Sequence, residues 1–245
     1  MFARLSEVLL PAIIGIMHKI EKLTDKEQRA QKAFVESLTV VSRKTKKPVM
    51  VAMIGLVGSG KSTVAKELAK HISATVIEGD AIRVFLRKEG EKYEGMRKIA
   101  ENAMEEIIRK GGNVILDSDH IDAKKRASLR EKAKKLGAEL NFIRTHAHWD
   151  IMVGYALATD YRDTPDDFFG GAPSLYQGDA KTKGAITKTR EMWRRTPHHY
   201  KWQNTGGGKW VLKKLPFPVL TTIDTMTDKW KEEVQKVAKK LVSKT

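Results

Sequence analysis

The sequence predicts an α/β fold of three layers, in which a mostly parallel sheet of five strands lies between two layers of helices. Two observations support this fold class. After residue 48, short apolar runs alternate with amphipathic stretches, as in a chain of strand–helix–strand units. The first run, at 49–54, is apolar at every position, which is typical of a strand buried on both faces. The length of 245 residues is enough for one large domain.

The expected elements follow from these runs and from the glycines that interrupt them, such as Gly137 after one helix. Strands are expected at 49–54, 75–78, 113–117, 139–144 and 217–223. Helices are expected at 61–71, 81–88, 93–109, 123–136, 149–158 and 227–242. The alternation of apolar runs with amphipathic stretches is lost at 160–216, which is rich in Gly, Pro, Asp and Lys. Because long structureless loops are uncommon in compact domains, this insertion is expected to carry function, helix, or both.

Residues 1–47 are expected to form a helical extension of a main domain at 48–245, since 42–48 is a basic, polar break. The apolar run 8–17 is shorter than the roughly 20 residues that span a bilayer. It predicts a helix packed on the main domain, with a membrane-surface anchor or a dimer or partner contact through residues 1–22 as alternatives. The chain has no cysteine, which excludes disulfides and favours a reducing, cytoplasmic location.

The charge is large and unevenly distributed. The chain has a net charge of +16. Residues 150–179 contain six acidic residues and one basic residue, whereas 181–214 contain ten basic residues and one acidic residue. A positive charge of this size suggests an anionic partner such as nucleic acid, a nucleotide or a membrane surface, and a general lysine-rich bias of the proteome is the alternative.

The segment 55–62, GLVGSGKS, fits the phosphate-binding pattern G-x-x-x-x-G-K-[ST] between an expected strand and an expected helix. Its glycines let the backbone wrap phosphates at the positive end of the helix. Lys61 would reach the β- and γ-phosphates, and the Ser62 hydroxyl would bind Mg²⁺. ATP and Mg²⁺ are therefore the expected ligands. The residues expected to hold the nucleotide are Gly55, Val57, Gly58, Ser59, Gly60, Lys61, Ser62 and Thr63.

Two acidic positions follow expected strands. Asp80 comes just after the second strand, where a carboxylate can take the proton from an attacking hydroxyl. Arg83 lies one helical turn later on the same face and can hold a phosphate; the alternative is a helix cap with a surface ion pair. Asp117 ends the third strand at the expected ligand crevice, where it would orient Mg²⁺ or bind the acceptor. Asp119 is the alternative at this edge.

The order of P-loop, strand, Asp-x-x-Arg and a strand ending in Asp resembles small P-loop kinases over residues 48–160. The run 114–120, VILDSDH, with a basic helix start after it, looks like the polynucleotide 5′-hydroxyl kinase group. Adenylylsulfate kinases and zeta-type toxin kinases are similar too. The resemblance implies that Asp80 is the general base and that Arg83 binds an acceptor phosphate. It also implies a lid with arginines, for which the run 190–195, REMWRR, is the candidate, and a basic surface helix is the alternative. Arg190 and Arg194 are the favoured lid residues, because one helix face would present both.

The insertion also interleaves aromatic and basic residues, namely Tyr200, Trp202 and Trp210 with Lys201, Lys209, Lys213 and Lys214. This pattern is typical of base stacking beside phosphate contacts, or else of a small subcore under a loop. The basic helix start at 124–126 predicts a solvated face, with anion contact as the alternative. The favoured function is therefore phosphoryl transfer from ATP to a hydroxyl group, with the 5′-hydroxyl of a nucleic acid as the favoured acceptor. A small-molecule kinase is the alternative, and an ATPase without kinase activity is the third.

Overall fold

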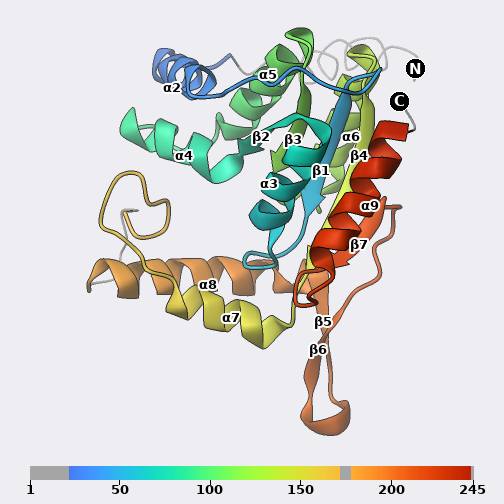
Figure 1. Cartoon of the computed structure of the whole chain (residues 1–245). Helices are drawn as coiled ribbons and strands as arrows, with labels where there is room; N and C mark the ends of the chain where they lie inside the picture. Colours follow the sequence, from blue (N-terminus) through green and yellow to red (C-terminus); the bar gives the residue numbers. More distant parts are fainter. Residues whose placement is uncertain (1–21, 172–177, 244–245) are drawn as a thin grey trace, which may run out of the picture.

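The computed structural model describes residues 22–171 and 178–243. Its main sheet has five parallel strands in the order β2-β3-β1-β4-β7 (Figure 1). The central strand β1 pairs Met50 with Val114 of β3 on one side and with Leu140 of β4 on the other. The strands are β1 (Val49–Ile54), β2 (Ala74–Glu78), β3 (Asn113–Asp117), β4 (Glu139–His146) and β7 (Thr221–Asp224). The predicted α/β fold class is confirmed.

Helices cover both faces of this sheet, because alternate residues of β1 belong to different cores. Met50, Ala52 and Ile54 face a core shared with α2, α4, α5 and α6. Val49, Val51 and Met53 face a core shared with α3 and α9. The helices are α2 (Asp25–Glu36), α3 (Lys61–Ile72), α4 (Gly79–Lys88), α5 (Met96–Arg109), α6 (Ala123–Lys135), α7 (Trp149–Ala158), α8 (Ala180–His199) and α9 (Trp230–Ser243).

Helix α2 belongs to the main core. It begins with a capping box, in which the Thr24 side chain accepts from the Glu27 amide and the Glu27 carboxylate accepts from the Thr24 amide. Its buried face contributes Ala30 and Phe34 to the first core. The apolar run at 8–17 and the contacts expected of residues 1–22 lie outside the described residues, apart from Lys22. Within 22–171 and 178–243, no helix has both the length and the apolar character needed to cross a bilayer.

The last strand differs from its prediction. The apolar run 217–223 suggested a strand over its whole length, but β7 begins at Thr221. Pro218 has no amide hydrogen for a sheet ladder. The preceding residues pack instead: the Phe217 ring lies 6.2 Å from that of Phe142, and the Arg126 guanidinium lies 3.5 Å over the Phe217 ring. The sheet therefore gains only three residues from this run, and Asp224 completes the strand.

The insertion has secondary structure of its own. It contains the 20-residue helix α8 and an antiparallel hairpin of β5 (Tyr200–Gln203) and β6 (Lys209–Leu212). Three consecutive glycines with positive φ, Gly206 to Gly208, turn the hairpin. Figure 1 shows α7 and α8 beyond the end of the sheet toward which β1 points, with the hairpin projecting from the body. The insertion therefore lies at the carboxyl ends of the strands, where open α/β sheets bind ligands.

Candidate functional site

The loop between β1 and α3 is shaped by glycines in left-handed conformations. Gly58 has a φ of 84° and Gly60 a φ of 79°, and Gly60 precedes the first turn of α3. No side chain caps this helix start. Its free amide groups, together with the helix dipole, therefore form a site for an anion. A Cβ on Gly60 would lie 2.7 Å from the Thr225 methyl group, so a larger residue at this position would displace the β7–α9 loop.

Lys61 folds back onto this loop. Its ammonium donates to the carbonyl oxygens of Gly55 at 2.9 Å and Leu56 at 3.0 Å. Burial lowers the pKa of Lys61, while the nearby carboxylates of Asp119, Asp117 and Asp80 oppose this shift. The Lys61 side chain is thus placed between the phosphate-binding backbone and the acidic residues at the ends of the strands.

Ser62 and Asp117 meet beside the loop. The Ser62 hydroxyl hydrogen-bonds to the Asp117 carboxylate, which is 9% exposed at the end of β3. Burial raises the pKa of Asp117, and the Ser62 bond and the Lys61 charge oppose that rise. In the described part of the chain, no three or more His, Asp or Glu side chains form a metal-binding group. The Ser62–Asp117 oxygens nevertheless fit Mg²⁺, which is usually held by one or two carboxylates together with substrate phosphates.

Asp80 lies in the first turn of α4, where the carboxyl end of β2 leads into the helix. Its side chain is about half exposed and forms an ion pair with Arg83. Gly79 lets this turn approach β3, because a Cβ at Gly79 would lie 2.2 Å from the Ser118 hydroxyl. The structure therefore brings Asp80, Arg83 and the end of β3 to one edge, as their positions in the sequence indicated.

Asp119 joins the P-loop to α8. Its carboxylate accepts from the Gly55 amide at 3.4 Å and from His199 Nε2 at 3.0 Å, and its Oδ2 atom lies 3.5 Å from Arg195 Nη1. Burial alone would raise the pKa of Asp119. The His199 hydrogen bond and the charges of His199, Lys61 and Arg195 outweigh burial and hold that pKa well below its usual range. Asp119 is thus a buried anchor between two segments far apart in the sequence.

The basic residues of α8 point in different directions. Arg194 is exposed and pairs with Glu191 at 2.9 Å. Arg190 is also exposed. Arg195 reaches Asp119, and its charge acts on Lys61. Of the three arginines, Arg195 is therefore the one that the structure places against Asp119 beside the P-loop, whereas Arg190 and Arg194 remain predictions as lid residues.

Lys188 is a further cation on α8 that the sequence analysis did not single out. Its ammonium donates to the Thr159 hydroxyl at 3.1 Å and lies 5.6 Å from the Tyr161 ring centroid. Burial lowers the pKa of Lys188, and the charges of Asp80 and Asp167 oppose that shift. Lys188 therefore faces the Asp80 side of the site.

The segment 160–171 is fastened to α4. Arg87 donates to the carbonyl oxygens of Pro165, Asp167 and Phe168 at 2.5, 3.0 and 3.2 Å. Lys88 forms an ion pair of 2.7 Å with Asp166. In this arrangement the Phe168 ring lies 5.4 Å from the Arg83 guanidinium, so the segment borders the Asp80–Arg83 pair.

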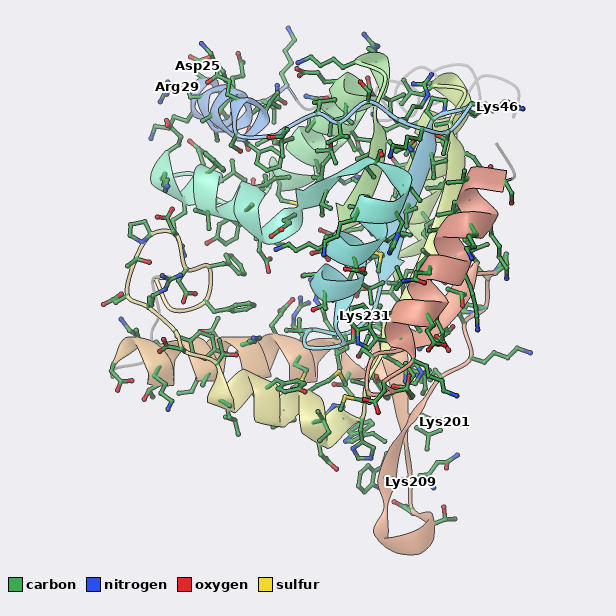
Figure 2. All side chains as sticks on the ribbon, viewed as in Figure 1. Asp25, Arg29, Lys46, Lys201, Lys209 and Lys231 are labelled. Atoms are coloured by element: carbon green, nitrogen blue, oxygen red, sulfur yellow. The ribbon has the colours of Figure 1, made fainter. Side chains whose placement is uncertain are left out.

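The aromatic residues of the insertion divide into buried and exposed members. Tyr200 is buried, and its hydroxyl donates to the Ala147 carbonyl at 3.0 Å. Trp210 packs beside Trp149 with ring centroids 5.7 Å apart, in a small core that includes Leu56 of the P-loop. Trp202 remains 50% exposed. Figure 2 shows Lys201 and Lys209 on the hairpin that carries Trp202. Tyr200 and Trp210 therefore pack in a small hydrophobic core, which the sequence analysis gave as the alternative to base stacking.

Sequence reasoning missed Lys188 and His199 as site residues, and within the lid run 190–195 it favoured Arg190 and Arg194 over Arg195. The basic pattern of 181–214 marked the region, but it could not show which side chains face the P-loop. His199 contacts a residue 80 positions earlier, which local patterns do not report. Asp119 was weighed only as an alternative to Asp117, and the structure gives the two residues different surroundings.

Comparisons with known proteins give one family match and several similar solved structures. Residues 50–155 match a family described as an AAA domain. No curated protein matches the chain. The APS kinase CysC of Mycobacterium tuberculosis, in complex with AMPPNP and APS, is 16% identical with a TM-score of 0.46 over 81% of this chain and 99% of that one. A putative kinase from Chloroflexus aurantiacus is 17% identical, with a TM-score of 0.48 over 81% and 98%. Shikimate kinase from Acinetobacter baumannii, in complex with shikimate, is 17% identical with a TM-score of 0.44 over 88% and 98%.

Proposed function

We propose that this chain is an ATP-dependent phosphotransferase that moves the γ-phosphoryl group of ATP to a hydroxyl group of a small molecule. One observation carries the proposal. Lys61 of the P-loop lies within electrostatic reach of both Asp117, which is bonded to Ser62, and Asp80 at the start of α4. A phosphate site, an oxygen pair suited to Mg²⁺ and a half-exposed carboxylate thus share one edge of the sheet.

Each of these groups has a distinct part in the transfer. The P-loop amides and Lys61 bind the phosphates, and the Ser62–Asp117 pair holds Mg²⁺. When bound, this ion supplies charge neutralisation at the phosphates. Asp80 accepts the proton of the acceptor hydroxyl, whose oxygen forms a bond to the γ-phosphorus while the bond to the β–γ bridging oxygen breaks and ADP leaves.

The cations around this edge oppose the negative charge that develops on the transferred group. Arg195 lies beside Asp119 and acts on Lys61, and Lys188 faces Asp80 from the same helix. Positioned cations of this kind stabilise the transition state without reorganising during the reaction. Arg190 and Arg194 retain this role only if α8 moves, because Arg194 pairs with Glu191 and both arginines are exposed.

A small acceptor is preferred to a nucleic-acid 5′-hydroxyl because of where the basic hairpin lies. Figure 1 shows this hairpin projecting from the end of α8 that lies away from α4, which carries Asp80. The exposed Trp202, Lys201 and Lys209 are therefore separated from the proposed base. On the Asp80 side, the fastened segment 160–171 borders the site instead.

The test is phosphoryl transfer from γ-labelled ATP with Mg²⁺ to a panel of acceptors. The panel contains adenylylsulfate, sugars, nucleosides, hydroxy acids and 5′-hydroxyl DNA and RNA. Asp80→Asn is the critical variant, and Asp150→Asn, an exposed acid on α7, is the matched control. We expect label on a small molecule, a loss of about 10²–10⁴-fold in rate for Asp80→Asn, and no change for Asp150→Asn.

Other outcomes separate the alternatives. Label on the oligonucleotides that weakens steeply with salt would overturn the small-molecule assignment in favour of a polynucleotide kinase. Release of free phosphate without any labelled acceptor, equal in wild type and Asp80→Asn, would leave an ATPase and refute the transferase.

A further inference from the structure

A hollow with a volume of about 50 Å³ lies between α5 and α6, at the carboxyl ends of β2 and β3. Its walls are largely apolar and include Ile77, Met96, Leu116 and Leu129. Ser118, His120 and Lys125 add three polar side chains. This is the usual composition of a small-molecule site, in which a few polar groups orient an apolar body.

Lys125 is the distinctive residue of this pocket. The other charged lining residues, Arg97 and Glu101, pair with one another at 3.0 Å. Among the described residues, no carboxylate forms an ion pair with Lys125, which is half-buried, whereas its neighbour Lys124 is exposed. Burial lowers the pKa of Lys125, as do the charges of Arg195 and Arg83, and Asp119 opposes them. A partly desolvated cation without a bonded counter-ion favours an anionic ligand.

The pocket lies next to the reacting edge. Ser118 lines it, and the Ser118 hydroxyl faces the position of Gly79, one residue before Asp80. A Cβ at Gly79 would lie 2.2 Å from that hydroxyl and 3.6 Å from Arg83 Nη1. A molecule in the pocket therefore has Lys125 on its wall and Ser118 at the end nearest to Asp80 and Arg83.

His120 adds a neutral polar group. Its Nδ1 atom lies 3.0 Å from the Met53 carbonyl oxygen and 2.8 Å from that of Ser118. Because carbonyl oxygens only accept, Nδ1 carries the proton, and Nε2 is an acceptor in the neutral ring. Burial lowers the pKa of His120, which favours that neutral ring. Lys125 is therefore the unpaired charge in the lining.

We propose that this pocket binds the phosphoryl acceptor, and that the acceptor is a small hydroxyl compound with an apolar or ring-shaped body and an anionic group bound by Lys125. This inference rests on the proposed function and names its substrate class. The anionic group is a phosphate, sulfate or carboxylate, since all three share the chemistry that Lys125 recognises. Lys125 is a binding residue that determines specificity, and Asp80 remains the base.

Binding is tested without relying on turnover. Phenyl phosphate, phenyl sulfate and benzoate serve as anionic probes and benzyl alcohol as the neutral one, all with ADP and Mg²⁺ present to fill the P-loop. The rate of reductive methylation of each lysine is followed by peptide mass spectrometry. We expect at least one anionic probe to slow methylation of Lys125 about ten-fold while Lys124 is unchanged and benzyl alcohol protects neither. The most protective probe identifies the anionic group.

Two variants complete the test. Lys125→Met should weaken binding of that probe at least ten-fold by calorimetry, and Lys124→Met should not. With the labelled acceptor from the panel, Lys125→Met should raise KM about ten-fold with kcat within three-fold. The inference is overturned if no anionic probe slows methylation of Lys125. It is also overturned if Lys125→Met and Lys124→Met weaken binding of the probe equally. Transfer to an acceptor whose KM is unaffected by Lys125→Met refutes the inference alone. Lys125 protection without any transfer refutes the proposed function, and with it the acceptor assignment, and leaves Lys125 as an anion-binding residue.

Discussion

Gly184 sets how closely α8 approaches Tyr161. A Cβ at this position would lie 2.3 Å from Tyr161 Cγ and 2.4 Å from Cδ1, and the Tyr161 ring is buried with its hydroxyl bonded to the Ala156 carbonyl. Gly184→Ala therefore forces the helix or the ring to move, and overpacking of this kind costs about 1–3 kcal/mol. The higher helix propensity of alanine returns about 1 kcal/mol. We expect a net loss of up to about 2 kcal/mol in the free energy of unfolding.

Gly154 on α7 provides the matched control. It is also inside a helix, and a Cβ there would meet no described atom within 4 Å. Gly154→Ala should stabilise the protein by about 0.5–1 kcal/mol through propensity alone. Urea unfolding of both variants, followed by far-UV circular dichroism, gives the difference between their free energies of unfolding. The gain in helix propensity from glycine to alanine is common to both variants and cancels in this difference. A difference below about 0.5 kcal/mol would refute the close contact between α8 and Tyr161, since overpacking requires at least about 1 kcal/mol.

The same substitution has a functional readout. Lys188 lies one turn beyond Gly184 on α8, and its ammonium lies over the Tyr161 ring. Displacing the helix at this point moves Lys188 relative to Asp80. We expect Gly184→Ala to lower kcat of phosphoryl transfer while Gly154→Ala leaves it unchanged.

Three further predictions concern residues of the insertion: His199 at the Asp119 anchor, the arginines of α8, and the buried Tyr200. His199→Asn leaves the buried Asp119 carboxylate without its imidazole partner and should lower the free energy of unfolding by about 3 kcal/mol, the lower end for a broken buried pair, in urea melts; a loss under 1 kcal/mol would contradict the anchor. Arg195→Met should reduce kcat about 10²-fold and Arg194→Met much less, because only Arg195 lies beside the P-loop in this structure; equal losses would favour Arg194 as a lid residue. Burial raises the pKa of Tyr200 to about 12, so its contribution to stability is complete below about pH 10 and is lost as pH rises toward 12. Urea melts at pH 9 and 11 should show a smaller alkaline loss in Tyr200→Phe than in wild type, and equal losses would argue against a buried phenol.

The sequence predicted the sheet well where burial alone defines a strand. Residues 49–54 and 113–117 are strands with these bounds, because 49–54 is apolar throughout, 113–117 is apolar between its polar ends, and both are buried inside the sheet. The strand–loop–helix arrangement around residues 55–62 was predicted equally well, since its glycines serve a local backbone shape. The run 217–223 was predicted too long because apolar character does not distinguish a strand from residues that pack on Phe142 and Arg126.

The candidate site was predictable only in its local parts. Asp80 and Arg83 form an ion pair three residues apart within one helix, so their pairing could be read from spacing. The 20-residue helix α8 was hidden in a segment with Gly184, Pro197 and many lysines, although Asp179 caps it by accepting from the Thr182 amide. Which of its cations face inward depends on contacts with residues tens of positions away, and no periodicity in a single segment contains that information.

The attachment of segment 160–171 has a consequence for how this protein can change over generations. Arg87 binds the segment through three main-chain carbonyl oxygens, which every amino acid possesses. Side chains there that make no contact of their own can therefore be exchanged while the segment keeps its position on α4, whereas Tyr161, Asp166 and Asp167 also hold it through their side chains. Gly171 is an exception, because a Cβ there would overlap the Thr164 carbonyl oxygen. A border that tolerates replacement of its side chains allows new substrates to be accommodated by single substitutions, with the phosphate-binding half of the molecule left untouched.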